Sequence, residues 1–412
     1  MAALRTLVAQ GRKRIGFLVG AGGPAGMKAD DGSTLIPAVA GLTGRVIAAL
    51  GPKYASQFAA LKGELGKGDI ESLLSRIRTL ASVLGSTAVH GLDGGGYKAF
   101  GEAICVEIGK VVRVGLPSGP SAYTDLVNWI TGAARYHAVE LFTSNYDLLF
   151  EEAFERVRAP YFDGFTGGRE AFFDPVSVSS GDLPTRWTRL WKVHGSLGWK
   201  ANAKGEVVRT GESNVTHLVF PEHLKYDQTQ KAPYSALLDR LRGFLATPDS
   251  LLLAIGFSFA DAHIAARIDE GLASSPSSSV FAFQFNSLDK EVAACDLASR
   301  RPNFSVYARD KAVVNGVPAK WEAPGELPTR DWGPIRASYW AASKSGDPSE
   351  FRLGAIDAFA GFLAASRAPQ AFDTLSLASV PPVSSPLSRI TLSDGLVIAA
   401  FDGLPSSASR LP

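Results

Sequence analysis

Short apolar runs recur along the chain, and several of them end at a cluster of glycine and polar residues. They cover residues 15–19, 138–143, 189–193, 217–220, 250–255, 280–285 and 304–308. Runs of this length, bounded by Gly, Pro, Ser, Asn or Asp, are typical of buried β-strands. We therefore predict a strand over each of them.

Between the runs, apolar residues recur every three or four positions, as in amphipathic helices. This spacing predicts helices over 39–50, 148–157, 234–245 and 351–364, and a mostly helical stretch over 56–112. Strands that alternate with helices favour a parallel sheet covered on both faces. The predicted fold is therefore α/β, a Rossmann-like, mostly parallel sheet with helices on both faces, plus a helical insertion over about 52–125.

The alternation weakens beyond residue 310. We predict one α/β domain over 1–310 and a C-terminal extension over 311–412 with a tail rich in Ser and Pro. We expect that tail to be partly disordered or to dock on a partner. Within the domain, residues 159–187 are predicted to be irregular, and a hairpin is expected around Gly205.

Composition excludes several classes of function. Lysine plus arginine (42) nearly balance aspartate plus glutamate (40), so no direct nucleic-acid binding is expected. Only Cys105 and Cys295 are present, which excludes a disulfide scaffold and a thiolate zinc site and fits a reducing cytoplasm. The apolar runs are shorter than the roughly 20 residues of a membrane span, so no membrane role is expected.

Gly20, Ala21 and Gly22 directly follow the first predicted strand. Glycine lets the backbone approach a pyrophosphate closely, and a following helix N-terminus supplies amide donors. The spacing to Gly26 does not match GxGxxG, however. A tight turn without a ligand is the alternative interpretation.

Polar residues also follow three later strands, where open α/β sheets bind their ligands. Asn145 and Asp147 follow the strand at 138–143, although helix capping also explains such residues. His194 follows the strand at 189–193, and a structural histidine is the alternative. Gly256 and Ser258, after 250–255, could receive a phosphate or a ribose hydroxyl, or simply form a turn in which Ser or Asp caps the next helix.

In chain order these motifs resemble the SIR2 (sirtuin-like) family, and more narrowly its bacterial antiphage-defence branch. The matching residues are Gly20-Ala21-Gly22, Leu35-Ile36-Pro37, Thr143-Ser144-Asn145-Tyr146-Asp147, Lys192-Val193-His194-Gly195-Ser196 and Gly256-Phe257-Ser258-Phe259. Secondary matches are Asp69-Ile70-Glu71, Lys225-Tyr226-Asp227, Pro233-Tyr234 and residues 308–321. The resemblance covers about residues 10–325.

The resemblance implies a Rossmann-like NAD domain with a smaller helical module. By the match, Asn145 and Asp147 engage the nicotinamide–ribose end of NAD, and His194 is the catalytic histidine. All three are expected to be catalytic residues. Ala21, Gly22 and Ser258, in turns shared with Gly20 and Gly256, help to hold the dinucleotide. NAD is then the substrate, and no metal is expected.

Sirtuin deacylases carry a four-cysteine zinc ribbon, which two cysteines cannot build. The defence branch also lacks the ribbon and typically hydrolyses NAD. We therefore expect an NAD glycohydrolase that releases nicotinamide and ADP-ribose, depleting NAD in antiphage defence. An NAD-dependent protein deacylase and a non-catalytic nucleotide-binding subunit are the alternatives.

Control of such an enzyme is expected to come from assembly, because an unrestrained NAD hydrolase would kill its host. We expect a homo-oligomer, and the chain length looks like the SIR2 partner encoded with a HerA-type ATPase. The helical insertion and the residues after 310 are the candidate contacts.

Overall fold

The computed structural model describes residues 2–9, 11–66, 68–210, 232–322, 325–327, 332–341, 350–367, 387–391 and 397–401. These form two compact units, Met1–Arg367 and Ala368–Pro412. The strand predicted at 217–220 and the motif Lys225-Tyr226-Asp227 lie outside the described residues. In the second unit, β16 (Leu387–Thr391) pairs antiparallel with β17 (Val397–Phe401). None of the helices in the described ranges is long and apolar enough to cross a membrane.

The first unit is built on a sheet in which nine of the described strands follow the order β13-β12-β11-β10-β9-β1-β2-β6-β3. Their bounds are β1 (Arg14–Val19), β2 (Glu140–Thr143), β3 (Tyr161–Phe162), β6 (Thr188–Lys192), β9 (Ser250–Ile255), β10 (Ser279–Phe283), β11 (Phe304–Tyr307), β12 (Lys311–Val314) and β13 (Val317–Lys320). All neighbours from β11 to β3 are parallel, and β12 and β13 are antiparallel. The predicted mostly parallel α/β sheet is confirmed.

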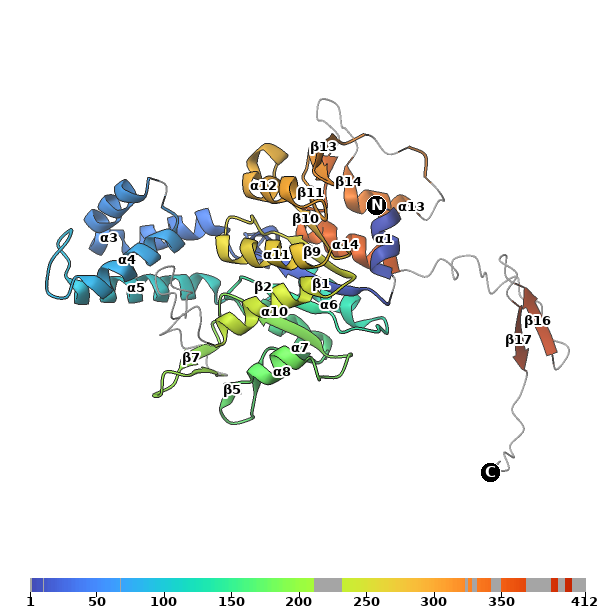
Figure 1. Cartoon of the computed structure of the whole chain (residues 1–412), viewed down its shortest axis with the longest axis horizontal. Coiled ribbons are helices and arrows are strands. Elements are labelled where there is room, and N and C mark those ends of the chain that lie inside the picture. The colour runs from blue at the N-terminus through green and yellow to red at the C-terminus, as the bar shows by residue number, and fades with distance from the viewer. Residues whose placement is uncertain are drawn as a thin grey trace. The chain divides into compact units, whose positions relative to one another are not determined.

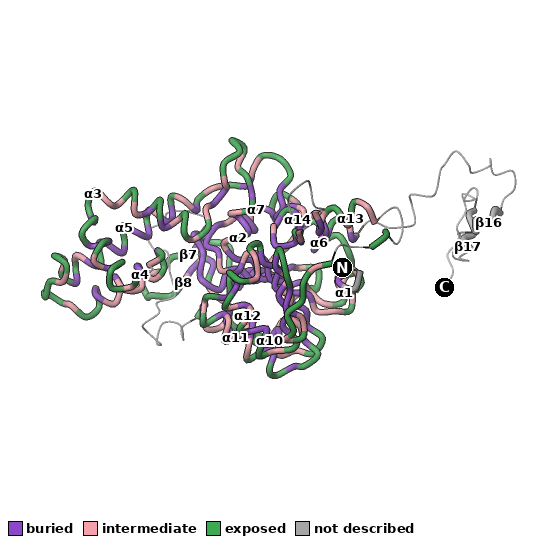
Figure 2. The backbone as a smooth tube through the Cα atoms, turned by 90° about the horizontal axis from the view of Figure 1, so that it is seen from above, coloured by how far each residue is buried: buried purple, intermediate pink, exposed green. Residues whose placement is uncertain are grey.

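Helices cover both faces of this sheet, also as predicted (Figure 1). Phe17 and Val19 of β1 belong to a core shared with α6 (Ala122–Thr131), α7 (Leu149–Val157) and α14 (Ile356–Arg367). Leu18 points to the other core, with α10 (Tyr234–Ala246), α11 (Ala262–Ser274) and α12 (Val292–Arg300). β1 therefore contributes side chains to two cores, because successive side chains along a strand point to opposite faces of the sheet. Figure 2 shows the buried backbone concentrated around the sheet.

The helical insertion forms a lobe that extends from one end of the sheet (Figure 1). It consists of α3 (Val39–Leu65), α4 (Ile70–Val83) and α5 (Gly94–Val112). The helix predicted at 39–50 is the first part of α3, which continues past Pro52 with a kink at Tyr54. Asp69 caps α4 by accepting a hydrogen bond from the Ser72 amide, and the apolar stripe of α4 faces the lobe interior. The next helix, α6, packs on the sheet rather than in the lobe.

The region after β2 has more regular structure than the sequence pattern indicates. It contains β4 (Phe165–Thr166), β5 (Ala171–Phe173) and α8 (Pro175–Ser180). The hairpin expected around Gly205 is present as β7 (Trp199–Ala201) and β8 (Val207–Arg209), and these four strands form a small sheet in the order β4-β5-β8-β7. Strands of two or three residues are too short to show a hydrophobic period, so 159–187 was wrongly predicted to be irregular.

The described residues between 311 and 367 belong to the first unit. β12 and β13 extend its sheet, and α13 (Trp332–Tyr339), β14 (Trp340–Ala341) and β15 (Glu350–Phe351) follow. α14 lies in the same core as β1, and ahead of it Gly354 packs so tightly that an added Cβ would be 2.2 Å from the Gln284 carbonyl oxygen. The first part of the predicted extension is thus integral to this unit. The remaining described elements are α1 (Ala2–Ala9), α2 (Gly22–Gly26) and the 3-10 helix η1 (Leu288–Lys290).

Candidate functional site

The predicted site residues gather at the carboxyl edge of the sheet, because four central strands end in register. Val19 pairs with both Ile255 and Thr143, and Thr143 pairs with Lys192. The turns that begin at Gly20 and Gly256, and the loops that carry Asn145 and His194, therefore leave the sheet side by side. The strand order also reverses between β1 and β9, which is where open α/β sheets place their ligands.

The glycine turn after β1 interlocks with the turn after β9. A Cβ on Gly20 would be 2.4 Å from the Gly256 carbonyl oxygen, and one on Gly22 would be 2.6 Å from the Gly256 Cα. Gly256 itself has φ +63, and its own Cβ would be 2.5 Å from the Gly23 nitrogen. Glycine is required here because two backbones touch, a reason that differs from the predicted approach to a pyrophosphate.

The amides of this turn are also engaged within the protein. The Gly20 amide donates to the Ile255 carbonyl at 3.1 Å. The Gly22 amide donates to the Gly256 carbonyl at 2.8 Å, and the Gly23 amide to the Gly20 carbonyl at 2.9 Å. The helix that follows, α2, has only five residues. These three amides are therefore satisfied by carbonyl groups within the protein, and the helix N-terminus behind the turn belongs to a short helix. Dinucleotide binding by Gly20, Ala21 and Gly22 stays a prediction.

Asn145 is held against the glycine turn. Its Nδ2 donates to the Gly20 carbonyl at 3.1 Å, and its backbone amide donates to Thr143 Oγ1 at 3.1 Å. Thr143 Oγ1 in turn donates to the Val19 carbonyl at 2.8 Å. The side chain is buried, so its carboxamide is anchored at the centre of the edge instead of capping α7.

Asp147 lies directly before Leu148, the N-cap residue of α7. Its Oδ1 accepts a hydrogen bond from the Leu149 amide at 3.1 Å, at the start of α7. Burial raises the pKa of its carboxyl from 3.8 to about 6, and the nearby Lys192 ammonium opposes that rise. Lys192 is itself buried, donates to the Asp147 carbonyl and pairs with Glu151 at 3.0 Å. Asp147 thus forms a turn with the first residue of α7 without being its N-cap, and its catalytic role stays a prediction.

His194 is paired with a carboxylate that we did not predict. Its Nε2 lies 3.0 Å from Asp261 Oδ2. The other oxygen, Asp261 Oδ1, accepts hydrogen bonds from the His263 and Ile264 amides at 2.9 Å each and caps α11. Burial alone would raise the Asp261 pKa, but the His194 hydrogen bond and charge and the Ile264 amide outweigh it and hold this pKa well below 3.8. Asp261 therefore stays ionised beside the imidazole.

The path of the chain explains this pairing. β9 and β6 are separated in the sheet by β1 and β2. The loop from Gly256 to Asp261 and the loop that carries His194 therefore meet across the ends of these two strands. The turn has left-handed backbone at Gly256 and at Phe259 (φ +59), and Gly195 (φ +98) turns the chain away directly after His194.

The helical lobe contributes a further carboxyl, Glu71, to this region. Its side chain reaches solvent, yet enough protein surrounds the carboxyl that desolvation raises its pKa above 4.5. The Asp69 and Asp261 charges raise this pKa further, and His194 lowers it. Glu71 was matched only as part of Asp69-Ile70-Glu71, and nothing in its spacing shows that it approaches His194.

The other residues of the β9 turn are more peripheral. Ser258 is exposed and its Oγ accepts a hydrogen bond from the Ala260 amide at 3.4 Å. His263 is exposed on the first turn of α11. Nucleotide binding by Gly256 and Ser258 stays a prediction.

A cavity of about 1540 Å³ lies next to the His194 loop. Leu148, Glu151 and Glu155 line one side, and residues 196–203 line another. Neither Asn145 nor His194 lines it, so we do not assign the chemistry to this cavity. In the part of the chain that the structure describes, no group of three or more His, Cys, Asp or Glu side chains is placed to hold a metal ion.

Residues 139–302 match the family model described as a SIR2-like domain. The matched range includes Asn145, His194 and Asp261, and it excludes the glycine turn at 20–22, which the fold brings to the same edge. No curated protein matches the chain. Over the matched range the chain is similar to a family that uses NAD.

Proposed function

We propose, with the SIR2-like match as the premise, that this protein is an NAD glycohydrolase that converts NAD and water to nicotinamide and ADP-ribose. The observation that carries the proposal is the pairing of His194 with an ionised Asp261, on the sheet edge that also holds Asn145. A histidine oriented by a carboxylate is the usual arrangement for a general base.

The bond to be broken joins ribose C1′ to the pyridinium nitrogen of nicotinamide. Its electron pair leaves with nicotinamide, which becomes neutral, so the leaving group needs no acid. The transition state then resembles an oxocarbenium ion, as in glycoside hydrolysis. The protein has to hold the ribose and nicotinamide in place and deliver water to C1′.

His194 is suited to activate that water. Because Asp261 is an ionised acceptor, the His194 nitrogen facing it, Nε2, carries the proton in the neutral ring. The lone pair is then on Nδ1, which can take a proton from water as the water oxygen bonds to C1′. The proton is later released to solvent, which balances the reaction.

Asn145 is suited to positioning. Its Nδ2 already donates one hydrogen bond to Gly20, so the plane of the carboxamide is partly set before the substrate arrives. The second Nδ2 hydrogen and Oδ1 can address a ribose hydroxyl or the nicotinamide amide. Asp147 supports this by anchoring the turn to the first residue of α7.

A protein deacylase using the same residues is the second candidate, with an acyl oxygen in place of water. The absence of a four-cysteine zinc ribbon from the sequence favours hydrolysis. Products separate the two: with NAD and an acetylated peptide, O-acetyl-ADP-ribose supports deacylation and ADP-ribose supports hydrolysis. A third candidate, a non-catalytic nucleotide-binding subunit, predicts that NAD binds and persists.

The test is NAD consumption by the purified full chain and three variants. We expect Asn145→Ala and His194→Ala to abolish turnover with the fold intact, as judged by circular dichroism. His137→Ala is the matched control, because His137 precedes β2 at the opposite end of the strands. Near-normal turnover by both site variants would show that the chemistry lies elsewhere.

Control by a partner or by self-association is also part of this proposal, as is a role in antiphage defence. Sizing after pull-down, with NAD depletion measured with and without a captured HerA-type ATPase, tests the first. A permanently active monomer that needs no partner would contradict it.

A further inference from the structure

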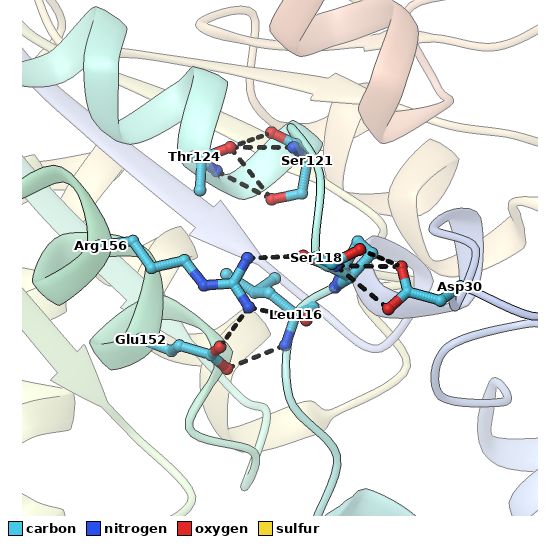
Figure 3. Close-up of polar contacts among 8 residues, drawn as sticks. Asp30, Leu116, Ser118, Ser121, Thr124, Glu152 and Arg156 are labelled. Carbon is cyan, nitrogen blue, oxygen red and sulfur yellow. Dashed lines mark hydrogen bonds and ion pairs between the residues drawn. The ribbon is translucent and has the colours of Figure 1, made fainter.

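Tyr123 is a fully buried tyrosine beneath the glycine turn. It is the second residue of α6, whose start is defined by a capping box between Ser121 and Thr124 (Figure 3). Its ring stacks on Phe150 of α7, with the ring centroids 3.9 Å apart and the planes at 8°. No part of the side chain reaches solvent, so packing alone sets its position.

The segment before α6 is held from two sides, which keeps Tyr123 in place. On one side, Asp30 accepts hydrogen bonds from the Ser118 amide at 3.0 Å and from its hydroxyl at 3.1 Å (Figure 3). On the other side, Glu152 accepts from the Leu116 amide at 2.9 Å, and Arg156 donates to the Leu116 carbonyl at 2.8 Å. These contacts join the loop after α2 to α7 through the entry to α6.

The hydroxyl of Tyr123 points to the glycine turn and Asn145. A Cβ on Gly23 would be 2.6 Å from the hydroxyl oxygen. Among the described residues this hydroxyl has no hydrogen-bond partner in normal geometry. Burial raises its pKa well above 10 and the Asp147 charge raises it further, while a side-chain hydrogen-bond interaction with Asn145 lowers it. The phenol therefore stays protonated and keeps a hydrogen to donate.

Buried hydroxyl groups without partners are rare because they give up hydration and receive nothing in return. Asn145 has a carboxamide oxygen that can accept a hydrogen bond from such a hydroxyl. Its carboxamide is held by one hydrogen bond from Nδ2 to Gly20, and a terminal carboxamide torsion is soft. A second bond, from the Tyr123 hydroxyl to Oδ1, would set both ends of the amide.

We propose that Tyr123 is a positioning residue for Asn145, which donates a hydrogen bond to its carboxamide oxygen when substrate engages the site. The proposal rests on the proposed NAD hydrolysis. It assigns the remaining Nδ2 hydrogen of Asn145 to the substrate, because Gly20 and Tyr123 then occupy the other donor and one acceptor position. A purely structural Tyr123 would contribute only its ring.

The test compares Tyr123→Phe with the matched control Tyr97→Phe. Tyr97, in α5 of the lobe, is also fully buried, and its hydroxyl also lacks a partner among the described residues. We expect Tyr123→Phe to lower kcat about five- to tenfold, as for one lost hydrogen bond, with KM for NAD changed less than about twofold. Tyr97→Phe should leave both unchanged. Rates are measured at a temperature well below the Tm of the less stable variant, so that unfolded protein does not lower the measured kcat.

The outcomes separate the two proposals. If the wild-type chain, with or without its partner, consumes no NAD, the proposed function fails and this inference fails with it. If the wild type is active and Tyr123→Phe matches Tyr97→Phe in kcat, only the role of Tyr123 is overturned. If Tyr123→Phe proves unstable, Tyr123→Trp, which keeps a ring and a donor, must recover kcat above that of Tyr123→Leu; equal losses would also overturn it.

Discussion

His194 and Asp261 meet at 3.0 Å although their strands are separated by two others in the sheet. Replacing Asp261 by Asn keeps an oxygen for the α11 amides, because Asn is as good a cap as Asp. It removes the ionised acceptor that sets the His194 tautomer. We expect Asp261→Asn to lower kcat by at least about a hundredfold with little change in Tm.

The control for this variant is Asp93→Asn. Asp93 caps α5 in the lobe by accepting a hydrogen bond from the Gly96 amide. This substitution should leave kcat unchanged. Equal kcat values for the two variants would remove Asp261 from the mechanism.

The Glu71 charge predicts a pH effect. Glu71 and His194 interact electrostatically, since His194 lowers the Glu71 pKa against the rise that burial causes. We expect Glu71→Gln to move the acid limb of the kcat/KM profile to lower pH, by less than about one pH unit. Glu102→Gln, on the exposed side of α5, serves as control. A shift to higher pH would contradict the assignment.

The interlocked turns predict an unusual cost for a single methyl group. Gly22→Ala sets a Cβ 2.6 Å from backbone Cα of Gly256, where no side chain can move away. We expect it to lower the free energy of unfolding by at least about 2 kcal/mol in urea titrations. Gly44→Ala, in α3 with open space around it, should instead raise it by about 0.5–1 kcal/mol. Equal effects would show that the turns can separate.

Asp147 predicts that stability depends on pH. Its pKa is raised from 3.8 to about 6 in the fold, so the folded state favours the protonated carboxyl. The associated stability is fully present below about pH 4 and is lost as pH rises through about 6. Asn also keeps the oxygen that accepts from the Leu149 amide. Asp147→Asn should therefore match wild type near pH 4 and be more stable near pH 8, by at most about 3 kcal/mol. A loss of stability at pH 8 would contradict the sign.

Six strands of the sheet could be predicted, because each of them is an apolar run that ends at a polar turn, whereas β3, β12 and β13 were not predicted. The same rule placed Asn145 and His194 on one edge, since parallel strands end together. Asp261 was not predicted as a site residue. Its pairing with His194 joins loops from two strands that are separated by two others, and no local sequence spacing indicates such a contact. Within its own segment, Asp261 is only a helix cap.

Tyr123 was not predicted from the sequence, for a different reason. In an amphipathic helix a single tyrosine has the same pattern as any core residue, and only the packed structure shows where its hydroxyl ends. The glycines were recognised as special from the sequence, but their contact with one another was not predicted. Contact between Gly22 and Gly256 joins parts of the chain that sequence spacing cannot relate.

The position of Asp261, late in the chain relative to His194, has a consequence for the newly synthesised protein. A chain still on the ribosome can hold Asn145 and His194 in place once β1, β2 and β6 have paired. Its histidine gains a carboxylate only after residue 261 has emerged and β9 has inserted beside β1. Nascent chains, and chains truncated before residue 261, therefore lack the carboxylate that pairs with His194 in the folded protein.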